Sequence, residues 1–156
     1  MNILRELYSN KLLITAALSW LIAQIIKTII DLIINKKIHF ERLVGSGGMP
    51  SCHSATVTSL ATMAALEHGL ASTEFAICTI LAIIVMYDAR GVRRETGKQA
   101  EVINQIINWI NNPGKTESPI KFTHENLKEL VGHTPLQVFC GALLGIALAF
   151  IFSAIL

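Results

Sequence analysis

The feature that most constrains this chain is a predominantly apolar run of 23 residues, 12–34. A helix of that length can cross the hydrocarbon core of a bilayer, which is about 30 Å thick. Three further apolar blocks follow at 54–71, 73–89 and 134–156. The first block lacks the small-residue cleavage site that ends a signal peptide, so we expect it to be retained. The pattern predicts an all-α, integral-membrane helical bundle with about four transmembrane helices.

The composition agrees with a membrane protein. The chain has 156 residues, which suits one domain, and we expect a single membrane-embedded domain over 1–156. Hydrophobic residues make up 52% and charged residues only 15%, against roughly 25% charged in soluble proteins. A net charge of +2 is too small to indicate a nucleic-acid partner. The three cysteines lack metal-ligand spacing, so we interpret them as reduced thiols.

The polar stretch between the third and fourth blocks contains an amphipathic pattern. Apolar residues recur at helical spacing through 92–110, which predicts an amphipathic helix. The segment Asn-Asn-Pro-Gly at 111–114 is expected to end it. A loop over 115–121 and a short helix over 125–131 complete the prediction.

Four crossings would sort the loops into two groups with very different charge. One group carries two Lys and Arg residues, whereas the segments 35–53 and 90–133 together carry ten. The positive-inside rule places the second group in the cytoplasm. We therefore expect a multi-pass protein of the cell membrane whose polar loops, and any site they hold, lie on the cytoplasmic face.

The polar residues that could do chemistry gather on this cation-rich side. Gln24, Lys27 and Asp31 share one face of the first helix. That face should meet protein or water, because a charge in lipid costs about 2.5–3.5 kcal/mol or more. The ends of the other three apolar blocks bring His53 and His133 to the same side. Four helix ends are thus expected to converge on one membrane face.

This combination of residues is typical of a phosphate site. The glycine-rich segment 45–48 and the helix that follows Pro50 present backbone N–H groups and a positive dipole end to an anion. Arginine forks match two phosphate oxygens, and a lysine adds a point charge. One histidine can attack phosphorus while a second protonates the leaving oxygen. No carboxylate cluster indicates a metal, so we expect chemistry without metal or cofactor.

Three blocks of sequence, in order, carry a family resemblance. They are Gly-Gly-Met-Pro-Ser-Cys-His-Ser-Ala at 47–55, Met-Tyr-Asp-Ala at 86–89 with Gly-Val-Arg-Arg at 91–94, and Gly-His-Thr-Pro at 132–135. The chain resembles the divergent branch of the type 2 phosphatidic acid phosphatases, also labelled acid phosphatase and vanadium-dependent haloperoxidase-related proteins. The resemblance covers 24–145. It implies a helical bundle that hydrolyses phosphomonoesters or diphosphates, often lipid-linked, through a phosphohistidine.

The resemblance also implies roles for individual residues. Its Pro-Ser-Gly-His motif falls on 50–53, which makes His53 the general acid and places Cys52 where glycine or serine is expected. Its His-x-x-x-Asp motif falls on His133 and Gln137, which makes His133 the nucleophile. A glutamine can orient an imidazole but cannot stabilise an imidazolium as an aspartate does.

The phosphate-binding cations match the family motifs only in part. Leu127 stands where an arginine is expected before His133, so Arg93 and Arg94 would substitute for it. The first motif of the family, Lys-x6-Arg-Pro, is broken here, because Lys36 and Arg42 are one residue too close and Leu43 replaces the proline. In its place we favour Lys27 with Arg42. The full candidate site comprises catalytic His133, His53 and Gln137; phosphate-binding Lys27, Arg42, Gly48, Ser51, Arg93 and Arg94; and supporting Asp31, Asp88 and Glu129.

The expected partners follow from a phosphate site at a bilayer face. They are the lipid bilayer and a phosphorylated lipid or isoprenoid substrate, with vanadate as a phosphate-mimicking inhibitor. Gly141 and Gly145 give the last helix a small-residue face. That face suits packing within the bundle or, as an alternative, a homodimer.

Other interpretations remain open at this point. The chain could be a catalytically inactive lipid-phosphate-binding or scaffold protein on the same fold, or a transporter or channel subunit. Locally, Lys27 and Asp31 could form a buried ion pair, Ser51 or His133 could cap a helix, and Arg93 and Arg94 could anchor anionic lipid. A cysteine phosphatase would need an arginine six residues after Cys52, where Thr58 stands.

Overall fold

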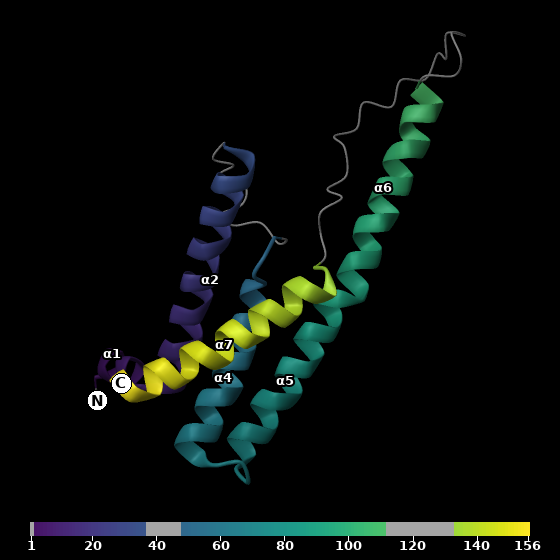
Figure 1. Ribbon diagram of the computed structural model, residues 1–156. Helices are drawn as coiled ribbons and strands as arrows, with labels where there is room; N and C mark the ends of the chain where they lie inside the picture. The colour runs from purple at the N-terminus through teal and green to yellow at the C-terminus, as the bar shows by residue number, and fades with distance from the viewer. Residues whose placement is uncertain (1, 37–47, 112–132) are drawn as a thin grey trace.

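The computed structural model describes residues 2–36, 48–111 and 133–156, and within these ranges it contains helices and no strand. The predicted all-α class is confirmed (Figure 1). The described elements are α1 (Ile3–Ser9), α2 (Lys11–Asn35), α4 (Cys52–His68), α5 (Thr73–Arg90), α6 (Val92–Asn111) and α7 (Pro135–Ile155).

Helix α4 is the centre of the bundle and packs against α2, α5 and α7 (Figure 1). Its buried positions are mostly small residues, as helix contacts within membranes favour, because small side chains let backbones approach closely. A Cβ atom added to Gly141 of α7 would collide with the carbonyl oxygen of Ser51, and one added to Gly145 would collide with that of Ala55. The small-residue face of α7 is therefore occupied by α4 of the same chain, the first of the two alternatives for that face.

Helix α2 presents small residues to α4 in the same way. Thr15, Ser19 and Ala23 recur every four residues and are fully buried. Ala23 packs with Cys52 and Ala55 in one buried cluster. At the other end of the two helices, Lys11 and Glu67 form an ion pair of 3.2 Å. These contacts hold α2 and α4 antiparallel.

Among the described residues, three helices are long and apolar enough to cross a membrane, and the predicted number of about four crossings stays a prediction. They are α2, α7 and a span that runs from α5 into α6, Thr73–Asn104. The predicted second crossing is α4, which has 17 residues and is rich in hydroxyl side chains. At 1.5 Å per residue it is about 25 Å long. Because α4 is surrounded by other helices, it needs no lipid-facing apolar surface of its own.

Apolar side chains cover the outer faces of the surrounding helices. Ile80 and Ile84 of α5 are more than half exposed, and so are Leu143 and Phe150 of α7. In water such a surface would drive aggregation, whereas in a bilayer it meets lipid tails.

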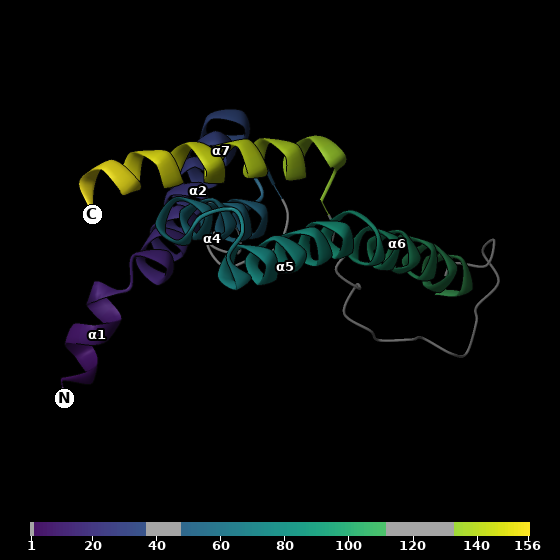
Figure 2. The same cartoon turned by 90° about the horizontal axis from the view of Figure 1, so that it is seen from below.

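Helix α6 matches the amphipathic helix predicted over 92–110. It extends beyond the end of α5 and away from the other helices (Figures 1 and 2). Among the described helices it packs only against α5, and Val102, Ile103 and Ile106 are exposed on it. The predicted loop at 115–121 and short helix at 125–131 lie outside the described residues. The sequence reasoning missed α1, a short helix separated from α2 by Asn10, whose side chain caps α2.

Candidate active site

The ends of α2, α4, α5 and α7 meet at one end of the bundle. The backbone N–H of Ser51 donates to the carbonyl oxygen of Gln137 at 3.1 Å, which joins the start of α4 to the first turn of α7. The backbone N–H of His133 donates to the carbonyl oxygen of Ala89 at 3.1 Å, which joins the segment before α7 to the end of α5. These bonds fix the relative positions of the two histidines.

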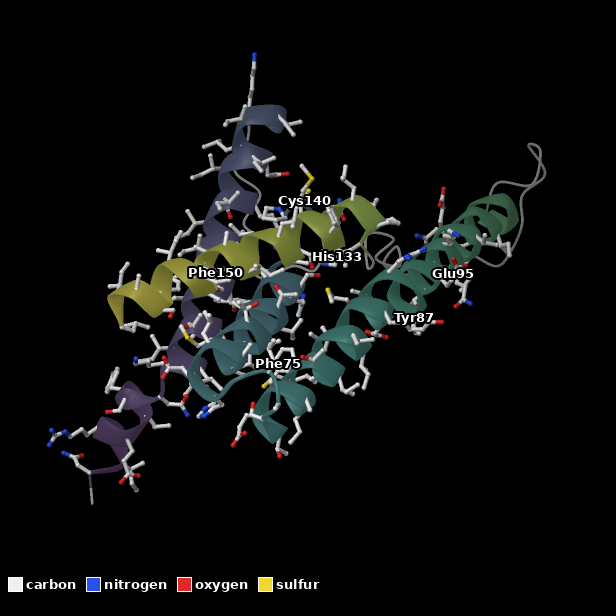
Figure 3. All side chains as sticks on the ribbon, turned by 60° about the horizontal axis from the view of Figure 1, so that its bottom comes forward. Phe75, Tyr87, Glu95, His133, Cys140 and Phe150 are labelled. Carbon is white, nitrogen blue, oxygen red and sulfur yellow. The ribbon has the colours of Figure 1, made fainter. Side chains whose placement is uncertain are left out.

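His53 and His133 face each other across this junction. Their ring centroids are 6.4 Å apart and the rings are tilted by 59°. His133 is buried at the N-terminal end of α7 (Figure 3), and His53 in the first turn of α4 is half-buried.

A single side-chain oxygen sets the orientation of His133. Oε1 of Gln137 accepts the backbone N–H of Thr134 at 3.0 Å and lies 3.2 Å from Nδ1 of His133. Since a backbone N–H can only donate, the glutamine atom that meets it is the oxygen rather than the amide nitrogen. The same oxygen faces Nδ1, so Nδ1 carries the hydrogen and donates it. In the neutral ring, the lone pair is therefore on Nε2.

Gln137 holds this place because it belongs to a capping box. Thr134 is the N-cap of α7; its side chain accepts the backbone N–H of Gln137 at 3.3 Å, while the Gln137 side chain accepts the N–H of Thr134. The sequence reasoning missed this, although Thr-Pro-Leu-Gln at 134–137 has the spacing of a capping box. It considered His133 as a cap, whereas the cap is Thr134.

Ser51 serves the start of α4 in a similar way. Its hydroxyl oxygen accepts the backbone N–H of Ser54 at 3.3 Å and the hydroxyl of Ser54 at 3.0 Å, and the residue is fully buried. The helix-cap interpretation is thus observed for the Ser51 hydroxyl, and its predicted contact with a substrate phosphate stays a prediction. Pro50 directly precedes this cap and lies outside the helix.

The side chain of Lys27 packs against the backbone of Gly48. Lys27 is 2% exposed. A Cβ atom added to Gly48 would lie 3.0 Å from Cδ of Lys27, and Gly48 has a φ of 88°, in the region that favours glycine. The absence of a side chain at Gly48 therefore leaves room for the aliphatic part of the Lys27 side chain. A buried ammonium requires anionic or hydrogen-bonding groups around it.

Some of the remaining predicted site residues lie within the described part of the chain and others lie outside it. Asp31 lies one helical turn beyond Lys27 on α2, and Asp88 precedes Ala89, whose carbonyl holds His133; both are partly buried. Arg93 and Arg94 fall at the start of α6. Arg42 and Glu129 lie outside the described residues. Over the described ranges, no group of three or more His, Cys, Asp and Glu side chains is arranged to hold a metal ion.

Taken together, the fold and the site define a helical membrane protein with a paired-histidine polar site at one end of the bundle. The sequence profile of the Divergent PAP2 family matches residues 8–148, and the chain belongs to that family. This confirms the resemblance carried by the three sequence blocks. The uncharacterized membrane protein YuiD of Bacillus subtilis strain 168 is 43% identical over 153 residues, which cover 95% of this chain and 97% of the relative. No solved structure matches the chain.

Proposed function

We propose that the protein is a membrane phosphatase that hydrolyses a phosphomonoester or diphosphate, lipid- or isoprenoid-linked, through a phosphohistidine and without metal. The observation that carries the proposal is the facing pair of His53 and His133, with Nδ1 of His133 held by Gln137. Membership of the Divergent PAP2 family supports phosphatase-like chemistry.

The first step forms the phosphohistidine. The lone pair on Nε2 of His133 attacks phosphorus, an N–P bond forms, and the bond from phosphorus to the leaving oxygen breaks with its electron pair on that oxygen. His53 gives its proton to the leaving oxygen. Gln137 keeps the hydrogen on Nδ1 of His133 during this step. It therefore holds the ring in the one tautomer that can act as a nucleophile.

The second step hydrolyses the phosphohistidine. Water attacks phosphorus and gives a proton to His53, the N–P bond breaks, and its electron pair returns to Nε2 of His133. Inorganic phosphate leaves, and both histidines regain their initial protonation states. The positive charge for binding the phosphate would come from Lys27 together with Arg42, Arg93 and Arg94.

The position of the site favours a lipid substrate. The histidines lie at one end of helices whose outer faces are apolar. A headgroup could reach them from the bilayer surface while its chains stay in the membrane. We place this end on the cytoplasmic face of a multi-pass protein, because the segments beside it carry ten Lys and Arg residues against two at the other end.

The test is phosphate release by the purified protein in detergent. The panel contains lipid phosphomonoesters and isoprenyl diphosphates, each with and without vanadate. We expect vanadate-sensitive release that is lost in His133→Ala and in His53→Ala. His68→Ala is the matched control, because His68 is exposed at the opposite end of α4. Release that survives in His133→Ala would contradict the mechanism.

A second candidate function is binding of a lipid phosphate without turnover. It is favoured by Gln137, which provides no negative charge where the family motif has an aspartate. It predicts that lipid phosphates bind to the purified protein, that none is hydrolysed, and that His133→Ala leaves their affinity within about twofold.

A further inference from the structure

We propose that α6 lies along the surface of the bilayer beside the histidine end of the bundle. Its apolar side chains Val102, Ile103 and Ile106 are then inserted between the lipid headgroups and the upper acyl chains. The partner of this apolar face is the same bilayer that α5 crosses. This placement of α6 goes beyond the proposed function and does not depend on phosphate hydrolysis.

The first observation is the length of the helical span that contains α6. The span Thr73–Asn104 has 32 residues, about 48 Å, whereas the hydrocarbon core is about 30 Å thick. The 18 residues of α5 alone extend about 27 Å. Helix α5 therefore crosses the core almost by itself, and α6 begins where α5 reaches the bilayer surface.

The residues at the end of α5 agree with a position at the membrane surface. Tyr87 is 76% exposed, and Arg90 in the last turn is exposed as well. Tyrosine is enriched at membrane–water interfaces, and arginine side chains near helix ends reach the headgroups. The carbonyl oxygen of Ala89 accepts the backbone N–H of His133, so the histidine pair lies at the same level.

The second observation is an apolar face that the described helices leave uncovered. Val102, Ile103 and Ile106 are 54%, 43% and 50% exposed. Residues three and four apart share one face of a helix, so Ile106 adjoins both of the others. Glu101 is exposed too, but it lies about 160° around the helix axis from Ile103. Helix α6 thus has an apolar side and a charged side along the same turns.

The bilayer suits this face better than a second copy of the chain does. Glu95 and Gln99 each stand seven residues before Val102 and Ile106, about two helical turns, and so share their face. A helix pair formed through that face would bury Glu95, which is exposed and bonded to Lys98 at 2.7 Å. A helix in the bilayer surface keeps such charges among the headgroups while its apolar side chains enter the lipid.

The chain between α5 and α6 permits the change of direction that this placement requires. In the structure α6 leads away from the bundle (Figures 1 and 2). Gly91 separates the two helices, and its φ of −93° and ψ of −90° lie outside the helical values. The carbonyl oxygen of Ala89, which would accept from residue 93 in an unbroken helix, accepts from His133. Rotation at Gly91 can therefore direct α6 along the surface without disturbing α5.

The first experiment measures the depth of two positions of α6 in nanodiscs of phosphatidylcholine and phosphatidylglycerol. The native cysteines are replaced by serine, and a fluorophore is attached to Ile103→Cys or to the matched control Glu101→Cys. Iodide quenches from water, and nitroxide-labelled lipids quench from the acyl chains. We expect the lipid nitroxide to quench position 103 about threefold more than position 101, and iodide to show the reverse order, because the apolar face is inserted.

Two results would overturn the placement of α6. Equal and strong quenching by iodide at both positions would show that α6 extends straight into water. Protection of position 103 from iodide and from the lipid nitroxide alike would show a protein partner, such as a second copy of the chain, in place of lipid.

A second experiment changes the apolar face itself. Ile106→Glu places a charge among the inserted side chains, so we expect it to lower the lipid quenching at position 103 to the level found at position 101. The melting temperature in detergent should stay unchanged, since α6 packs only against α5 among the described helices. Lys98→Gln, on the charged side, is the control and should leave the quenching unaltered. Undiminished lipid quenching in Ile106→Glu would contradict insertion of this face.

Discussion

At the residue scale, the orientation of His133 and the start of α7 depend on the same oxygen atom. Oε1 of Gln137 closes the capping box with Thr134 and also receives the hydrogen of His133. A capping interaction contributes about 1 kcal/mol to a helix. Because the same side chain aligns the nucleophile, a substitution at position 137 is expected to alter both the stability of α7 and the rate of turnover. Different substitutions can separate these two effects.

Gln137→Glu keeps the shape of the side chain and both acceptor contacts but adds a negative charge. The charge stabilises the imidazolium form of His133, so the ring loses its proton at a higher pH. We expect the rising limb of the pH–rate profile to move up by roughly 1–3 pH units, with faster turnover above it. Gln137→Leu loses both contacts and should lower turnover about 100-fold through misalignment. A Gln137→Leu variant as active as the parent would contradict the assigned role.

Gly48→Ala tests the matched packing of Gly48 and Lys27. The added methyl group would press on the lysine stem, and alanine at this positive φ costs about 1–3 kcal/mol. We expect KM and the vanadate inhibition constant to rise about tenfold or more, because Lys27 is displaced from the phosphate.

Gly69→Ala is the matched control for that variant. Gly69 also has a positive φ, 85°, but an added Cβ atom there would meet nothing within 4 Å. It should reduce stability without changing KM. If Gly69→Ala raised KM as much as Gly48→Ala, the role of Lys27 would be excluded.

The sequence predicted the proximity of the two histidines but not the atoms that orient them. His53 and His133 each stand beside a helix start, and the two helix starts lie at the same end of the bundle. The hydrogen position on His133 depends on a side-chain contact of Gln137. Such contacts follow from rotamers and backbone register, which residue spacing does not determine.

At the scale of the helices, α4 shows that hydropathy alone does not identify the helix at the centre of the bundle. It is the least apolar of the four predicted crossings, yet it has the most buried residues of the described helices. Hydropathy measures how well a helix tolerates lipid, whereas α4 contacts mainly other helices. The bounds of α2, α5 and α7 were predicted within a few residues because each of these helices coincides with one long apolar run of the sequence.

Gly145→Ala tests the close contact between α7 and α4. In an isolated helix, alanine is about 1 kcal/mol more favourable than glycine. Here the added methyl group would collide with the carbonyl oxygen of Ala55, and overpacking costs roughly 1–3 kcal/mol. We therefore expect a lower melting temperature in detergent. Ala147→Leu, at an exposed position of the same helix, should leave it nearly unchanged. Unaltered or increased stability of Gly145→Ala would contradict the packing.

At the scale of the whole molecule, the two ends of the bundle differ in charge and in chemistry. The sequence segments 35–53 and 90–133, which adjoin the two histidines, contain ten Lys and Arg residues, whereas the other end of the bundle has the Lys11–Glu67 ion pair and the turn between α4 and α5. The proposed orientation of the bundle in the membrane therefore predicts which of its two ends can be labelled from outside the cell.

Single cysteines placed at the two ends would report that orientation. Ala71→Cys lies in the exposed turn after α4, and Gln99→Cys is exposed on α6. In a chain whose native cysteines are replaced by serine, we expect a membrane-impermeant maleimide to label position 71 in whole cells and position 99 only after lysis. The opposite labelling pattern would place the histidines outside the cytoplasm.

Both termini lie at the end of the bundle away from the histidines (Figure 1). Helix α7 begins beside His133 and runs 21 residues, about 31 Å, to its last turn near the C-terminus. An affinity tag on either terminus would therefore attach the protein to a bead or sensor surface with the histidine pair pointing into solution. Such an immobilised protein would keep its site accessible to vesicles that flow past it.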